Sequence, residues 1–179
     1  MGMLQKIVAF VPEEKRDQAL AAAGGAALLS GQKFTAIIMF GRGVSGLEKK
    51  WRVRHPEFRG DFSQRWAAAT SFYEQTHQDP TNRVLHMAGI PLIVGGALGL
   101  LVAPRYSPPW FLSATAFVGG WGMNLVGHYK YEKNAPAFAE DPLSFVAGPV
   151  WDAQQLAKVI RKRFATATSS VSAPEVATA

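Results

Sequence analysis

Cysteine is absent from this 179-residue chain, and its absence limits the chemistry that the protein can perform. Without thiols the chain has no disulfide framework and no thiolate ligand for a metal. Any bound metal must therefore be held by imidazole, carboxylate or amide oxygen. We also expect no secretory leader, because residues 1–12 contain one lysine and a short apolar run without a small-residue cleavage signal.

Charged residues are scarce in the middle of the chain, where residues 87–103 contain none. Together with Val84 and Leu85 they form a stretch of about 20 residues, the length that crosses the hydrocarbon of a membrane. The formal net charge is +6, and the lysines and arginines flank apolar segments instead of lining a polar helix. This pattern favours membrane lipid over nucleic acid as the partner of the basic residues.

Two apolar segments, residues 84–103 and 110–126, are joined by a short proline-rich loop. Such a loop makes the second segment return beside the first as an antiparallel neighbour. Asp79-Pro80 is a helix start signal, an acid at the cap followed by proline at the first helical position. We therefore predict an all-α fold, a membrane-embedded helical bundle built on an antiparallel hairpin with flanking amphipathic helices.

The distribution of positive charge predicts how this hairpin is oriented. Arg105 is the only charge in the loop at its tip, whereas Arg83 and Lys130 lie at the opposite end. Positive charges collect on the cytoplasmic side of membrane proteins. The sequence therefore predicts an integral membrane protein whose polar hairpin ends face the cytoplasm.

The chain is long enough for one domain, with three parts. Residues 1–60 form a partly apolar N-terminal extension of unknown role, residues 61–164 the helical membrane domain, and residues 165–179 a small, polar tail that we expect to be disordered. Within the extension, residues 19–40 are compatible with a broken third membrane segment, a re-entrant element or an interfacial helix. The glycine-rich residues 41–46 predict a flexible turn.

Three of the four histidines lie at the polar ends of the predicted hairpin. His86 follows Asn82 by four residues, and Glu132 follows His128 by four, so each pair shares a helix face. Because a hairpin brings its ends together, and because histidine at a membrane boundary is costly without a partner, we predict a metal site of His77, His86, His128 and Glu132. These donors suit ferrous iron or zinc, and the pattern does not choose between them.

These residues also resemble a known family. The pattern Tyr73-x-x-x-His77-x-x-Pro80-x-Asn82-x-x-x-His86, then Trp121, then Gly127-His128-x-x-x-Glu132-Lys133-x-x-Pro136-Ala137 is similar to the membrane 2-hydroxy-fatty-acid dioxygenases, typified by the fungal enzyme of phytosphingosine α-oxidation and its bacterial relatives. The resemblance covers roughly residues 66–160. It implies an Fe(II)-dependent reaction, without 2-oxoglutarate, in which O2 is used to shorten a 2-hydroxy fatty acid by one carbon.

Carried over position by position, the resemblance makes His77, His86 and His128 the iron ligands. It makes Asn82 and Glu132 groups that bind the metal or support its ligands. A 2-hydroxy carboxylate can chelate a metal through two oxygens, and Arg83 or Lys130 would help to neutralise its charge. The acyl chain would lie between the two apolar helices or in the lipid.

Two other functions fit the same residues. The first is a non-catalytic membrane protein, a lipid-binding or scaffold subunit whose histidines are hydrogen-bonded helix caps. The second is a zinc-dependent lipid hydrolase, which would use the same imidazoles. The sequence indicates neither the oligomeric state nor the chain length of the substrate.

Overall fold

The structure is a computed structural model that describes residues 10–171, and all regular elements in this range are helical. The prediction of an all-α fold is confirmed. The α-helices are α2 (Arg16–Leu29), α3 (Lys33–Arg54), α4 (Phe62–Gln75), α5 (Pro80–Val102), α6 (Pro108–Val126) and α7 (Ser144–Val171). Three short helical turns accompany them, namely η1 (Glu13–Lys15), η2 (Gly127–Glu132) and η3 (Ala137–Ala139).

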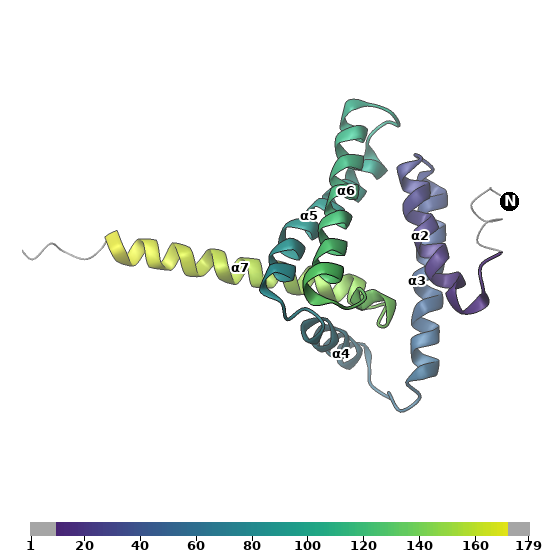
Figure 1. Cartoon of the computed structure of the whole chain (residues 1–179), viewed down its shortest axis with the longest axis horizontal. Coiled ribbons are helices and arrows are strands. Elements are labelled where there is room, and N and C mark those ends of the chain that lie inside the picture. The colour runs from purple at the N-terminus through teal and green to yellow at the C-terminus, as the bar shows by residue number, and fades with distance from the viewer. Residues whose placement is uncertain (1–9, 172–179) are drawn as a thin grey trace, which may run out of the picture.

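Helices α5 and α6 stand side by side and run in opposite directions (Figure 1). Glycines allow the two backbones to approach closely, as in other tightly packed helix pairs. A Cβ added to Gly96 would lie 2.6 Å from the backbone nitrogen of Phe117, and one added to Gly120 would lie 2.5 Å from the carbonyl oxygen of Gly89. Small residues at this interface are therefore a packing requirement.

Local signals explain where these two helices begin. The Asp79 side chain accepts hydrogen bonds from the backbone N–H groups of Thr81 and Asn82, as predicted for the start of α5. Ser107 caps α6 in the same way. By length and composition α5 is, within residues 10–171, the one helix that could cross a membrane.

Helices α2 and α3 form a second hairpin, so the prediction of a flexible turn at residues 41–46 is wrong. The chain turns instead at residues 30–32, where Gly31 has a φ of 75°. Gly43 lies inside α3, and a Cβ there would be 2.5 Å from the backbone nitrogen of Ala21 in α2. The glycines of α3 thus serve close helix packing, which outweighs their low helix propensity.

The tips of the two hairpins pack together. Lys33, at the start of α3, donates from Nζ to the carbonyl oxygen of Ala103 at 2.8 Å, and the Arg105 side chain covers Gly31. Beneath these contacts lies a buried apolar cluster from both hairpins: Ala27, Leu28, Ala36, Leu100, Ala103 and Trp110. Residues 19–40 therefore lie beside the tip of the α5–α6 pair.

Helices α4 and α7 cross the opposite end of α5 and α6 (Figure 1). Arg65 of α4 is 1% exposed and donates to Glu48 of α3 at 2.9 Å and to Asp141, just before α7, at 2.6 Å. Its guanidinium also lies 3.6 Å from the ring centroid of Trp51. One buried arginine therefore joins α3, α4 and the segment that leads into α7.

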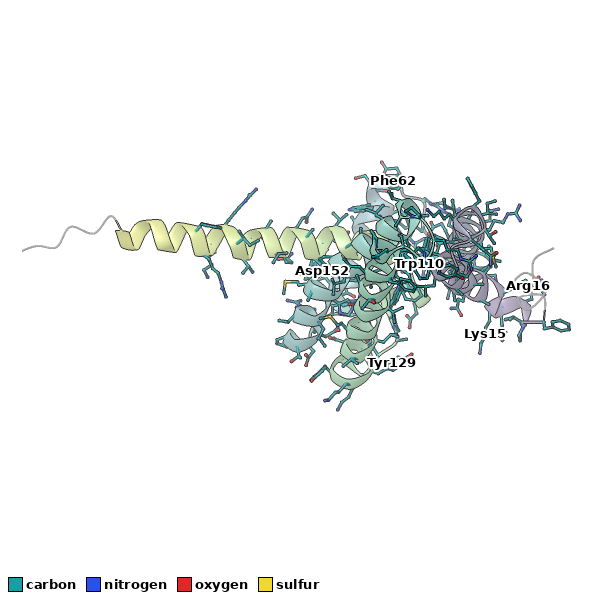
Figure 2. All side chains as sticks on the ribbon, turned by 90° about the horizontal axis from the view of Figure 1, so that it is seen from above. Lys15, Arg16, Phe62, Trp110, Tyr129 and Asp152 are labelled. Carbon is teal, nitrogen blue, oxygen red and sulfur yellow. The ribbon has the colours of Figure 1, made fainter. Side chains whose placement is uncertain are left out.

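The second half of α7 projects away from the other helices (Figures 1 and 2). The helix continues to Val171, beyond the predicted start of the tail at Ala165, because no proline or glycine occurs between Pro149 and Pro174. The remainder of the predicted tail, residues 172–179, and most of the segment tested for a leader, residues 1–9, lie outside the described residues.

Candidate metal centre

Three imidazole rings meet where the α4–α5 connection, α5 and η2 come together. The ring centroids of His77, His86 and His128 are 4.7, 4.8 and 4.8 Å apart, and each pair of ring planes is close to perpendicular. All three side chains are buried, and their potential ligand atoms lie within 4.8 Å of one another. This group could hold a metal ion.

Hydrogen bonds at Nδ1 determine which nitrogen of each ring is available. Nδ1 of His77 lies 2.7 Å from the carbonyl oxygen of Tyr73, Nδ1 of His86 lies 3.0 Å from that of Asn82, and Nδ1 of His128 lies 2.8 Å from Oδ1 of Asn134. Because these oxygens only accept hydrogen bonds, each Nδ1 carries the proton. The unprotonated Nε2 atoms are thereby left as the ligand atoms.

Burial favours the neutral rings that metal binding requires. Burial, with a smaller contribution from neighbouring His86, lowers the pKa of His77 to about 3. Burial also lowers the pKa of His128, against the opposing effects of Asn134 and Glu132. Both imidazoles therefore resist protonation and keep a lone pair for a metal.

A second, independent observation indicates that the three histidines fit a metal. Nε2 of His77 is buried and has no hydrogen-bond partner in the described structure. An orphaned buried acceptor costs free energy unless a ligand compensates it. Three neutral imidazoles without thiolates suit zinc or ferrous iron, as the sequence predicts.

Glu132 lies beside this group, and its two oxygens bind protein donors. Oε1 accepts from the backbone N–H of Gln78 at 2.7 Å, and Oε2 accepts from the N–H of Asp79 and from Nδ2 of Asn82, each at 2.9 Å. The carboxylate thus joins η2 to the loop that carries His77 and to the first turn of α5. The group that could hold a metal within residues 10–171 consists of the histidines alone.

The residues around His128 are not a continuation of the α6 helix. Residues Gly127–Glu132 form a π-helical turn, and Lys133 then adopts a left-handed conformation. Single π turns are rare and frequently occur at functional sites. After this turn Asn134 returns to His128, whose carbonyl oxygen accepts from the Asn134 N–H at 3.3 Å and whose Nδ1 lies 2.8 Å from Oδ1 of Asn134.

The predicted cationic residues have different environments. Arg83 donates from Nε to the carbonyl oxygen of His77 at 2.6 Å, and its guanidinium lies over the Trp151 ring. Lys130 is exposed, with its ammonium near the ring of Tyr131. The fourth histidine, His55, stacks on Trp51, apart from the other three.

Two further residues, Asn134 and Asp152, support the site without being predicted from the sequence. The Asn134 side chain accepts at Oδ1 from His128 and donates from Nδ2 to the Thr76 carbonyl oxygen. Asp152 accepts a hydrogen bond from Tyr73, which stacks on His77. The spacing of six residues between His128 and Asn134 is a sequence signal for that contact, but no local signal connects Asp152 with a tyrosine 79 residues away.

One of three comparisons with known proteins found a match, and it covers the region that carries the site. Searches of curated proteins and of solved structures found no match. A family model described as "2-hydroxy-palmitic acid dioxygenase Mpo1-like" matches residues 63–160, more than half of the chain. The matched region contains all three histidines of the cluster, together with Asn82 and Glu132. The chain therefore belongs to the 2-hydroxy-palmitic acid dioxygenase Mpo1-like family.

Proposed function

We propose that the chain is an Fe(II)-dependent dioxygenase that shortens a 2-hydroxy fatty acid by one carbon at a membrane. The observation that carries this proposal is the buried cluster of His77, His86 and His128, whose Nδ1 atoms are all engaged and whose Nε2 atoms are left for a metal. Family membership supplies the reaction class.

In this proposal the three histidines would hold Fe(II) beside the bound 2-hydroxy fatty acid. Bound iron would supply the O2 activation that the oxidation needs. Asn82 and Glu132 are proposed to support the histidines by fixing the backbone around residues 77–82. Their hydrogen bonds across 50 residues or more of sequence suit that role.

Arg83 and Lys130 are the proposed partners of the substrate carboxylate. A guanidinium has five N–H donors, and the Nε–H of Arg83 is used on the His77 carbonyl. Arg83 is thereby anchored beside the cluster while retaining its charge. Lys130 is exposed at the same end of the α5–α6 pair and would attract the carboxylate from solution.

The membrane part of the proposal rests on outward-facing apolar surface. In the most apolar stretch of α5, 28% is buried within the protein, whereas a core helix of a soluble protein would be mostly buried. We propose that α5 and α6 form a membrane-embedded hairpin with the histidine end on the cytoplasmic side, and that the acyl chain lies along them in the lipid. The large exposed apolar side chains of these helices are Val84, Leu92, Val94, Leu98, Val102, Phe111, Leu112, Val118, Leu125 and Val126.

The test uses full-length protein purified in detergent. We expect one iron to copurify or to bind anaerobically, and oxygen uptake with 2-hydroxypalmitate to yield a fatty acid one carbon shorter. Palmitate, which lacks the 2-hydroxyl group, should support no uptake. His86→Ala should lose both metal and activity while keeping its helical circular dichroism.

Three results would contradict the proposal. Wild-type protein that folds but binds no metal would support structural histidines in a scaffold or lipid-binding protein. Recovery of a lipid-hydrolysing activity with zinc alone would support the hydrolase. Iron-loaded protein that consumes no oxygen with any 2-hydroxy fatty acid would separate the metal site from the family's reaction.

A further inference from the structure

His77 is held by two neighbouring residues that contact different parts of it. The Tyr73 ring stacks on the imidazole, with centroids 3.8 Å apart and planes at 23°, and the Tyr73 carbonyl accepts from Nδ1. Arg83, which follows His77 by six residues, donates to the His77 carbonyl oxygen. Unlike His86 and His128, His77 lies in a connection between helices, so these contacts matter more for its orientation.

Both neighbours are in turn held by α7. The Tyr73 hydroxyl donates to Oδ2 of Asp152 at 2.5 Å, and both residues are 4% exposed. The guanidinium of Arg83 lies 5.2 Å from the Trp151 ring centroid, and that ring also packs edge-on against Tyr73. Figure 2 labels Asp152 in the half of α7 that lies against the other helices.

The packing beneath Tyr73 is equally restrictive. A Cβ on Gly148 would overlap the Tyr73 ring. Gly148 and Asp152 are four residues apart and therefore lie on one face of α7. The phenol is held between a glycine that admits its ring and a carboxylate that accepts its hydroxyl, so α7 determines both the position and the rotation of the ring that stacks on His77.

A buried carboxylate at position 152 costs free energy that an apolar side chain of similar size would not cost. A buried charge loses its hydration, and apolar residues often replace buried ionic groups without loss of stability. A carboxylate does, however, orient a hydrogen-bonded partner more strictly than an apolar contact can. Residues that orient metal ligands in this way commonly change metal affinity 10- to 100-fold when they are removed.

We propose that Asp152 is a positioning residue for the metal centre, which acts through the Tyr73 hydroxyl to hold the His77 imidazole in its ligating orientation. The C-terminal helix thereby becomes part of the metal centre, although none of its residues belongs to the histidine cluster. This inference rests on the proposed function, since it assumes that the three histidines bind a metal.

The experiment measures metal affinity in full-length protein, using Co(II) as a spectroscopic probe and Fe(II) in anaerobic competition with a chelator. Asp152→Ala should weaken binding by about 10- to 100-fold and alter the visible Co(II) spectrum. Asp152→Asn should stay within about threefold of wild type, because its amide oxygen still accepts from Tyr73. Tyr73→Phe keeps the stacked ring and loses only the hydroxyl, so it should behave like Asp152→Ala.

A destabilised control separates positioning from general loss of fold. Leu100 is fully buried near the opposite end of α5, and Leu100→Ala should lower the unfolding temperature without changing Co(II) affinity or spectrum. Wild-type affinity in both Asp152→Ala and Tyr73→Phe would overturn the inference and leave the proposed function intact. Failure of Asp152→Asn to rescue would also overturn it. Absence of metal binding in the wild type would overturn the proposed function itself.

Discussion

At the candidate metal centre, we propose that Glu132 supports the histidine cluster from outside the ligand group. Its carboxylate accepts from two consecutive backbone N–H groups, those of Gln78 and Asp79, and from the Asn82 amide. Each hydrogen bond to a charged group typically contributes about 1.5–3 kcal/mol. The loop that carries His77 therefore depends on a residue more than 50 positions further along the chain.

A substitution of Glu132 distinguishes support from ligation. Glu132→Gln keeps one acceptor oxygen but loses the charge, so we expect metal affinity to fall about tenfold while saturating Fe(II) still gives full occupancy. His128→Ala should not be filled at any practical concentration. Metal titration with quantification of bound iron checks both. Equal loss of iron in the two variants would make Glu132 a ligand.

A substitution at Gly127 tests the packing around Asn82, beside the histidine cluster. A Cβ at this position would overlap Oδ1 of Asn82, a buried residue whose Nδ2 donates to Glu132. We expect Gly127→Ala to destabilise the fold by about 1–3 kcal/mol and to weaken metal binding. The matched control is Gly122→Ala, where a Cβ meets nothing within 4 Å. Chemical denaturation of both variants in detergent should show loss for the first and none for the second.

Asp152 should make stability depend on pH. Burial raises the pKa of Asp152 to about 6 from its ordinary value of 3.8, although Tyr73 and Arg83 act in the opposite direction. The folded state therefore binds this proton more tightly than the unfolded state. The resulting stabilisation is present below pH 3.8 and is lost as the pH rises through about 6.

Replacing Asp152 by asparagine tests this sign. We expect the free energy of unfolding of Asp152→Asn, relative to wild type, to increase between pH 4 and pH 8 by on the order of 2–3 kcal/mol. Denaturation at several pH values provides the measurement, and Glu57→Gln serves as an exposed acidic control. A relative stability that stays constant or falls with rising pH would contradict the burial of a charged carboxylate.

At the scale of helices, the glycines determine which surfaces meet. Gly24 and Gly43 permit the contact of α2 with α3, and Gly89, Gly96 and Gly120 permit that of α5 with α6. Glycine weakens an isolated helix by about 1 kcal/mol, and this local cost is what suggests turns or breaks from the sequence. Close packing of the partner backbone offsets the cost only after the helices associate.

Two adjacent glycines of α5 give a matched test. A Cβ on Gly96 would lie 2.7 Å from the Ser113 carbonyl oxygen, whereas one on Gly95 meets nothing within 4 Å. Gly96→Leu should force the helices apart and cost about 2 kcal/mol or more, and Gly95→Leu should be neutral or stabilising. Thermal unfolding of the two variants in the same detergent checks the difference. Equal unfolding temperatures would place Gly96 outside a tight helix contact.

At the scale of the whole molecule, the two hairpins present polar turns at one end and the histidine cluster lies at the other. Lys33 and Arg105 are at the tips, with Ala103 and Gly31 as their contacts. The exposed apolar side chains of α5 and α6 lie between these ends. This arrangement suits a bilayer, with one polar end in each interface.

The absence of native cysteine makes this arrangement testable by labelling. In intact membrane vesicles, a single cysteine at Leu98 should resist a membrane-impermeant maleimide until detergent is added. Cysteine at Gln78 should react only from the cytoplasmic side, and cysteine at Tyr106 only from the opposite side. Free labelling at Leu98 in intact vesicles would place the exposed apolar face of α5 in water and refute the membrane proposal.

The sequence by itself determined the features that depend on local chemistry. The cap at Asp79 predicts where α5 begins, because a side-chain acceptor satisfies the N–H groups of the first turn. The apolar segments predict helices, and the histidine spacing together with the family pattern predicts which three rings come together. None of these inferences needs knowledge of a distant contact.

Only the tertiary structure decided how the site is held. Glu132 reaches the loop of His77 across more than 50 residues, and Asp152 reaches Tyr73 across 79. Helices α2 and α3 pack closely because their glycines let the two backbones approach, although glycine has a low helix propensity. Such contacts depend on which surfaces the folded helices bring together. Helix starts are local and readable along the chain, whereas the partners of a buried side chain are selected by packing in three dimensions.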